Sequence, residues 1–242
     1  MRNWKEEKEK RVAFIRQMLK EAGAEGIVYG NSGGKDSVLT GILCRLACDE
    51  VLGVIMPCAS KQNYGADMED AKVAAKLYGI RCVTVDLTPA REALLRAVEQ
   101  VEGIVPQAVN NIAPRLRMSA LYALAQSRQS LVAGTGNRSE IHMGYFTKWG
   151  DGAYDFNPIG DLTATEVRDF LRYLQAPAHI IEKAPSAGLY EGQTDEGDMG
   201  ISYSAIDRFL CEGQAEAADR EVIERYHLAS GHKRRKTPIY GE

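Results

Sequence analysis

Residues 26 to 37 read Gly26-Ile27-Val28-Tyr29-Gly30-Asn31-Ser32-Gly33-Gly34-Lys35-Asp36-Ser37, and they set the architecture expected for this 242-residue chain. They begin as a short apolar run of strand type, continue as a glycine-rich turn, and lead into a segment with helical spacing. At such a junction the unpaired N–H groups and the positive end of the helix dipole bind anions. We therefore expect the first strand and helix of a phosphate-binding α/β unit.

One helix pattern precedes this unit, and alternating strand and helix patterns follow it. An amphipathic helix is expected before it, ending near Gly23. After it, the expected strands are 51–56, 81–87 and 130–134, and the expected helices are 37–48, 66–78, 88–101 and 114–129. Alternation of this kind, with nearly continuous apolar strands, predicts a Rossmann-like parallel twisted sheet flanked by helices on both faces.

The pattern changes after Gly136, where a stretch rich in glycine and aromatic residues runs to Pro158. Thr163 and Glu166 have the spacing of a capping box, which predicts a helix that ends before Pro177. Further helices are expected at 203–211 and 216–229. We expect one domain over 1–242, with a nucleotide-binding sheet core at about 24–136 and a substrate loop, C-terminal helices and tail at 137–242.

The composition limits the function classes. Thirty Lys and Arg against 33 Asp and Glu give a formal net charge of -3, which argues against a nucleic-acid-binding protein. The sequence contains neither an apolar run of the ~18 residues that a membrane span needs nor a visible secretory leader, so the expected location is the cytoplasm without membrane contact. The five cysteines include no C-x-x-C pair, and Cys44 and Cys48, four apart on an expected helix, are expected to pack in the core rather than to serve a metal or redox role.

The turn itself carries groups suited to phosphate chemistry. Gly33 and Gly34 leave room for an anion, Ser32 and Ser37 offer hydroxyl donors, and Asp36 places a carboxylate where a divalent cation bridges it to phosphate. The spacing is not that of a Walker P-loop. The hexapeptide Ser-Gly-Gly-Lys-Asp-Ser after a strand resembles the signature of the ATP pyrophosphatases, and the resemblance implies adenylation of a substrate.

Further candidates follow from the rule that ligands of open α/β sheets bind beyond the carboxyl ends of the strands. Glu140 follows the 130–134 strand, so it is expected to join Asp36 in a magnesium site. Arg115 and Arg117 begin the helix that leads into this strand, so both are expected to face the same crevice and bind phosphate or carboxylate.

Longer motifs are similar in order and spacing to those of the NAD synthetases, over about residue 26 to the C-terminus. The matching blocks are 111–118 (NIAPRLRM), Gly134-Thr135 leading to Glu140, 144–152 (GYFTKWGDG), 184–187 (APSA), 200–203 with 206–207, and 232–234 (HKR). The resemblance implies the fold of the adenine nucleotide alpha hydrolases, a homodimer, and Mg²⁺ as cofactor with ATP as co-substrate.

Site roles are implied by the same resemblance. ATP would be bound by Gly30, Asn31, Ser32, Gly33, Gly34, Lys35, Asp36, Ser37, Thr135 and Ser186, and magnesium by Asp36 and Glu140. Deamido-NAD would be bound by Arg115, Lys148, Asp155, His232 and Lys233. Two departures stand out: Ser186 replaces the usual threonine, and Ala164 stands where the family commonly has a basic residue, which puts one phosphate contact in doubt.

The reaction implied is ATP-dependent amidation of deamido-NAD to NAD, the last step of NAD biosynthesis. The nicotinate carboxylate attacks the α-phosphorus of ATP, pyrophosphate leaves, and ammonia then displaces AMP from the acyl adenylate. Asp36, Lys148 and Asp155 are the catalytic candidates: Lys148 would hold negative charge at the reacting carboxyl, and Asp155 would accept a proton from ammonium. The expected elements leave no segment for a glutamine-hydrolysing domain, so ammonia is the expected direct donor, and a separate glutaminase subunit stays open as its source.

Two other readings stay open at this point. The chain can be another ATP pyrophosphatase, such as a tRNA thiolase or a GMP synthetase core, although none of its cysteines lies in the turn or near Glu140. It can also be a regulatory module that binds a nucleotide without turnover. Pyrophosphate release from ATP with deamido-NAD, with and without ammonium, separates the three.

Overall fold

The structure, a computed structural model, describes residues 2–58, 64–183 and 194–241. Its strands are β1 (Gly26–Gly30), β2 (Val51–Ile55), β3 (Arg81–Thr84) and β4 (Ser130–Ala133). They form a parallel sheet in the order β3-β2-β1-β4, with Ile27 of β1 in register with Val51 on one side and Leu131 on the other. The expected parallel sheet is confirmed, and β1 with its glycine-rich turn lies in its interior.

The helices that were expected from their period are confirmed with shifts of a few residues at their ends. They are α1 (Trp4–Ala22), α2 (Lys35–Ala47), α4 (Ala66–Leu77), α5 (Thr88–Glu99), α7 (Ile112–Ser127), α9 (Ala164–Tyr173), α12 (Tyr203–Glu212) and α13 (Ala217–Ala229). The described part of the chain also contains five short helices that were not expected: α6 (Pro106–Asn110), α8 (Arg138–Met143), α10 (Ala178–Glu182), α11 (Asp195–Met199) and α14 (Gly231–Arg234). Each is too short to show a helical period in the sequence.

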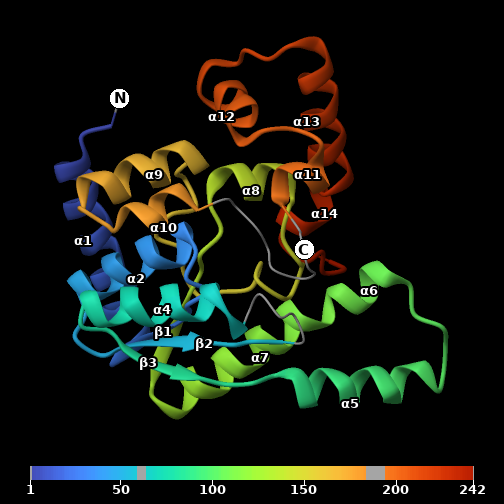
Figure 1. Ribbon diagram of the computed structural model, residues 1–242, viewed down its shortest axis with the longest axis horizontal. Helices are drawn as coiled ribbons and strands as arrows, with labels where there is room; N and C mark the ends of the chain where they lie inside the picture. Colours follow the sequence, from blue (N-terminus) through green and yellow to red (C-terminus); the bar gives the residue numbers. More distant parts are fainter. Residues whose placement is uncertain (1, 59–63, 184–193, 242) are drawn as a thin grey trace.

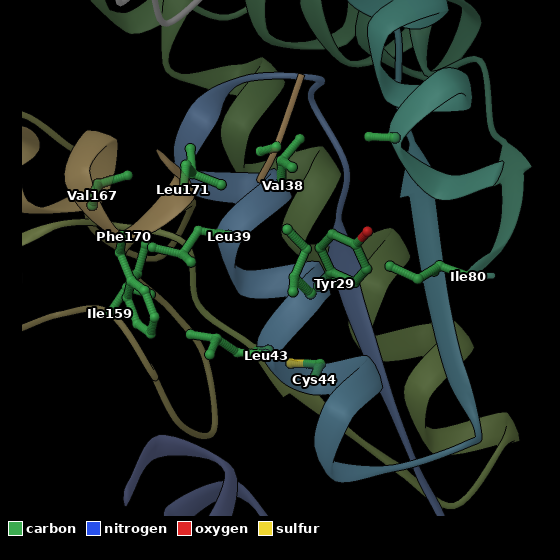
Figure 2. Packing of buried hydrophobic residues seen from close by; sticks show 14 of the residues in the cluster. Tyr29, Val38, Leu39, Leu43, Cys44, Ile80, Ile159, Val167, Phe170 and Leu171 are labelled. Carbon is green, nitrogen blue, oxygen red and sulfur yellow. The ribbon is translucent and has the colours of Figure 1, made fainter. Parts of the chain in front are cut away.

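Helices cover both faces of the sheet, as expected (Figure 1). Side chains alternate along β1: Ile27 and Tyr29 are buried on the side of α2, whereas Val28 is buried against α7 on the other side. Tyr29 lies within the cluster formed by α2 and its neighbours (Figure 2). The two faces explain why the strands are apolar at nearly every position.

Helix α9 is fixed on the outer side of α2. Val167, Phe170 and Leu171 share a buried cluster with Leu39 and Leu43 of α2 (Figure 2). The predicted capping box is present at the start of α9, where Thr163 and Glu166 satisfy each other's backbone N–H groups. On the far side, the Trp4 ring stacks on Phe170 with centroids 5.0 Å apart. The first turn of α9 is therefore held in a defined position.

A separate apolar cluster joins the C-terminal helices to α8, with Met143, Ile206 and Ile223 among its buried residues. All five cysteines are free thiols; Cys44 is buried, as expected, and Cys48 is half-buried and packs against the same core cluster. None of the helices that the structure describes combines the length and the apolar character that crossing a bilayer requires.

Candidate active site

A cavity of about 1090 Å³ opens beyond the carboxyl ends of β1, β2 and β4. Its wall combines the turn after β1, the segment after β4, the start of α7 and residues of the C-terminal tail. Of the predicted site residues, those that line it are Gly30, Asn31, Ser32, Gly34, Lys35, Asp36, Ser37, Thr135, Glu140 and Lys233. The structure thus brings the glycine-rich turn and the acidic residue after β4 to one place. Ser186 lies outside the described residues.

The turn is built on Asn31 and Gly33. The Asn31 side chain donates to the carbonyl of Ala71 at 3.0 Å and accepts from the N–H of Gly33 at 3.3 Å. Gly33 has φ +74°, and a Cβ there would stand 2.3 Å from the carbonyl oxygen of Asp67. Gly33 therefore permits the close approach of α4, whereas Gly34 lies in the cavity wall where an anion would bind.

The first turn of α2 faces the cavity without a side-chain cap. Gly34 is its N-cap, and Ser37 Oγ donates to the Gly34 carbonyl at 2.9 Å while lying 3.1 Å from Ser32 Oγ. Lys35 is buried, its ammonium donates to the carbonyl of Lys183, and burial lowers its pKa. Backbone donors, hydroxyl groups and one ammonium thus meet at a helix N-terminus, an arrangement suited to a polyphosphate.

Two carboxylates from different elements face each other across this turn, and Asn137 holds both. The Asn137 side-chain amide donates to Asp36 Oδ1 at 3.0 Å, and its backbone N–H donates to Glu140 Oε2 at 2.9 Å. Burial raises the pKa of Asp36. The pKa of Glu140 lies well above its ordinary value, because of burial first and the negative charge of Asp36 second. A divalent cation would relieve this repulsion.

The donor set fits Mg²⁺ supplied together with a nucleotide. Magnesium prefers oxygen ligands and is commonly held by one or two carboxylates plus substrate phosphate and water. Over the described ranges no group of three or more His, Cys, Asp or Glu side chains is arranged to hold a metal ion without such help. Asp36 and Glu140 would supply the protein oxygens, and phosphate oxygens at the start of α2 would complete the coordination.

The raised pKa of Glu140 predicts a pH dependence of stability. Above its ordinary pKa of 4.5 the folded state keeps a proton that the unfolded chain releases, so this residue makes the free energy of unfolding fall as the pH rises toward the raised value. Glu140→Gln keeps the capping box and removes the charge. We expect its Tm without Mg²⁺ to decline less between pH 5 and 8 than that of the wild type, as measured by calorimetry. Equal declines would contradict the coupling.

The two arginines of α7 point in different directions. Arg117 lines the cavity, where its Nε donates to the Met56 carbonyl at 3.1 Å. Arg115 is exposed, and its Nε donates to the Lys148 carbonyl at 3.4 Å. Residues two apart lie roughly 200° apart around a helix. The expectation that both face the crevice is therefore right for Arg117 and wrong for Arg115.

The glycine-rich loop and the tail hold each other. Lys148 Nζ donates to the carbonyl of His232 at 3.1 Å, and Lys233 Nζ donates to the carbonyls of Gly144 and Phe146 at 2.8 and 2.7 Å. Lys233 is in the cavity wall, whereas Lys148 and His232 lie outside it. Lys233 is therefore a structural part of the cavity wall, whereas Arg235 and Lys236 beyond it are exposed.

The family model described as NAD synthase matches residues 7–238. The chain belongs to the NAD synthase family. It is 46% identical over 236 residues to the NH3-dependent NAD+ synthetase of Carboxydothermus hydrogenoformans, with 96% of each chain covered. In structure it is similar to the NMN synthetase of Francisella tularensis (TM-score 0.94, 37% identity, 100% of both chains). It is also similar to the NH3-dependent NAD synthetase of Campylobacter jejuni (TM-score 0.79, 28% identity, 99% of both chains).

Two aspartates near the loop differ in their access to the cavity. Asp155 is exposed outside the cavity wall, and its oxygens accept from the Val132 N–H at 2.7 Å and the Tyr122 hydroxyl at 3.1 Å. Asp151 is also solvent-exposed, but it lines the cavity and accepts from the Thr147 N–H at 2.9 Å. Asp151 is thus a second candidate that sequence reasoning did not select, and the role of Asp155 stays a prediction.

Replacing Asp151 or Asp155 by alanine shows which of the two aspartates accepts the proton. We expect Asp151→Ala to reduce amide formation at subsaturating ammonium about 10²-fold or more, as loss of an acid–base group does. Asp155→Ala leaves the Val132 N–H without its acceptor, so we expect ~1–3 kcal/mol loss of stability. Initial rates against ammonium concentration and thermal melts measure the two effects. Unchanged rates in Asp155→Ala would remove its proton-accepting role, and unchanged rates in Asp151→Ala would remove that candidate.

Asn137 is the positioning residue that sequence reasoning missed, although a signal was present. Asn137 and Glu140 are three apart at the start of a helix, the spacing of a capping box, and the structure shows both of its hydrogen bonds.

Ala164, the departure from the family pattern, is the first residue of α9 and lines the cavity.

Proposed function

We propose that this chain catalyses the ATP-dependent amidation of the nicotinate carboxylate of deamido-NAD, with ammonia as the nitrogen donor. The observation that carries the proposal is the pair Asp36 and Glu140, joined through Asn137 at the uncapped start of α2. The carboxylate attacks the α-phosphorus of ATP and pyrophosphate leaves. Ammonia then attacks the acyl carbon, AMP leaves, and one proton passes to an acceptor.

In this proposal the start of α2 binds the phosphates of ATP. The N–H groups of the turn, the hydroxyls of Ser32 and Ser37 and the ammonium of Lys35 offer donors, and Thr135 lies in the same wall. Ser186 keeps its proposed role as an ATP contact. Asp36 and Glu140 would hold Mg²⁺, which neutralises the charge that develops on the departing pyrophosphate.

The acceptor side of the site uses the loop and the tail. Lys233 presents its charge in the cavity wall, where it suits a phosphate or carboxylate of the acceptor. Lys148 and His232 form the hydrogen bond that closes the loop, so we propose that they bind deamido-NAD at the outer edge of the cavity. Arg115 and Asp155 are proposed for the same substrate on the exposed surface beside it.

A second acceptor deserves a direct test, because the Francisella tularensis protein with a TM-score of 0.94 is an NMN synthetase. Nicotinate mononucleotide carries the same carboxylate as deamido-NAD but lacks the adenylate half. The two acceptors require the same adenylation and the same attack by ammonia. They differ only in how much of the acceptor lies beyond the cavity.

The deciding experiment offers both acceptors. The wild-type chain is incubated with ATP, Mg²⁺ and ¹⁵N-ammonium plus equal concentrations of deamido-NAD and nicotinate mononucleotide, and products are followed by mass spectrometry. We expect AMP, pyrophosphate and labelled NAD. Labelled NMN as the main product would assign the mononucleotide. ATP binding without pyrophosphate release with any acceptor would indicate a regulatory module, and ADP as product would overturn the adenylation chemistry.

We also propose a homodimer. Helix α5 has no buried residue and extends from the body of the chain (Figure 1), and Leu94, Val98, Val101 and Val105 in and after it are exposed. A second copy would cover these side chains. We expect the double variant Leu94→Glu with Val98→Glu to lower the mass measured by light scattering from that of a dimer to that of a monomer. The control Leu228→Glu, at an exposed leucine of α13, should leave the dimer mass unchanged. A wild-type monomer would contradict the proposal.

The cytoplasm is the proposed location of this activity. The five free thiols fit a reducing compartment, because paired cysteines are typical of oxidising ones.

A further inference from the structure

Arg168 of α9 is a partly buried arginine without an anionic partner among the described residues. Its Nε is buried and makes no hydrogen bond, and the guanidinium forms no hydrogen bond or ion pair with another described residue. The neighbouring Arg172 pairs with Asp169 at 2.7 Å, and Arg11 pairs with Asp161 at 2.6 Å. A desolvated donor without an acceptor is unfavourable unless a ligand supplies one.

The position of Arg168 directs it toward the phosphate-binding turn. It lies one helical turn after Ala164, on the same face of α9, and Ala164 is in the cavity wall. Side chains on a helix lean toward its N-terminus, which directs the Arg168 side chain toward Ala164, although Arg168 itself is not among the residues that line the cavity. The methyl group at 164 leaves that route open.

The guanidinium charge of Arg168 interacts with Lys35 and Asp36 in the first turn of α2. The relative position of the two helices is fixed, because Val167 and Leu171 pack with Leu39 of α2 (Figure 2). Arg168 therefore lies on a helix that is packed against α2, the helix whose first turn forms the anion site.

We propose that Arg168 binds the β- and γ-phosphates of ATP, the part that leaves as pyrophosphate. A planar guanidinium forms paired hydrogen bonds with phosphate oxygens, and such charge-assisted bonds are among the strongest in proteins. Arg168 would then act in the adenylation step, because negative charge accumulates on the departing pyrophosphate. The inference rests on the proposed function for the nucleotide but does not depend on which acceptor is amidated.

The test compares ATP and AMP binding by isothermal titration calorimetry in buffer with Mg²⁺ and without acceptor. We expect Arg168→Ala to weaken ATP binding about 10- to 100-fold and to leave AMP binding unchanged, since only ATP carries the terminal phosphates. The double variant Ala164→Lys with Arg168→Ala places an ammonium in the same wall and should recover most of the loss. Arg172→Ala, on the same helix but paired to Asp169, is the matched control.

Three outcomes would overturn the inference: ATP binding equal to the wild type, equal loss of ATP and AMP binding, or no recovery in the double variant. If Arg168→Ala does not fold, Arg168→Gln takes its place, and wild-type affinity for ATP in that variant rejects the contact. Steady-state kinetics should show a higher KM for ATP with an unchanged KM for the acceptor. A wild-type chain that binds ATP but amidates neither acceptor refutes the proposed function and leaves this inference standing.

Discussion

Asp36→Asn is expected to abolish pyrophosphate release from ATP and at the same time to raise the Tm of the metal-free protein. Asparagine still accepts the hydrogen bond from Asn137, so the local geometry is kept. The charge is lost, and with it half of the carboxylate pair proposed to hold Mg²⁺. We expect kcat to fall about 10³-fold, in the range found when a main electrostatic contact of the transition state is removed.

The expected gain in stability has the same origin. The charge of Asp36 contributes to the raised pKa of Glu140, so removing it lets Glu140 ionise at lower free-energy cost. A relief of ~1 kcal/mol would raise the Tm by about 2–4 °C for a chain of this size. Melts at pH 8 without Mg²⁺ measure it, with Asp49→Asn at an exposed site as control. A lower Tm, or retained activity, would show that the two carboxylates do not act as a pair.

Gly144→Ala is expected to impair both folding and activity. Gly144 has φ +67° at the C-terminus of α8, and a Cβ there would stand 2.1 Å from Ser230 Cβ of the tail. α13 would have to move away from the end of α8, the helix that carries Glu140. We expect a loss of ~3 kcal/mol or more, about 6–12 °C in Tm, because overpacking adds to the strain of a left-handed residue.

Gly213→Ala is the matched control for that prediction. Gly213 also ends a helix with positive φ, +71°, but a Cβ there meets no atom within 4 Å. We expect a loss of only ~1 kcal/mol and normal activity, since the backbone strain is the same and the clash is absent. Similar melts for the two variants would show that the contact between Gly144 and Ser230 is unimportant.

What the sequence predicts well is local. The β1 strand, its turn and α2 are contiguous, and their periods change at the turn itself, so their roles follow from residues 26–47 alone. The convergence of Asp36 and Glu140 was also predictable, because both follow parallel strands and such strands end at one edge of a sheet.

What the sequence does not predict depends on contacts between distant segments. Lys233 donates to the carbonyl of Gly144, 89 residues away in the sequence. Asp155 accepts hydrogen bonds from residues of β4 and α7. No spacing in the sequence reveals such pairings. Arg115 shows a different limit, because the rotation of a helix about its axis is set by which side packs on the sheet, and a shift of two residues reverses the direction of a side chain.

The contacts of Lys233 have a consequence during protein synthesis. The loop at 144–148 is held by residues that are translated 84 to 89 residues after it. The glycine-rich turn at 30–37 therefore leaves the ribosome well before the tail can fix this loop. We expect a nascent polypeptide to form the start of α2 before this wall of the cavity is complete.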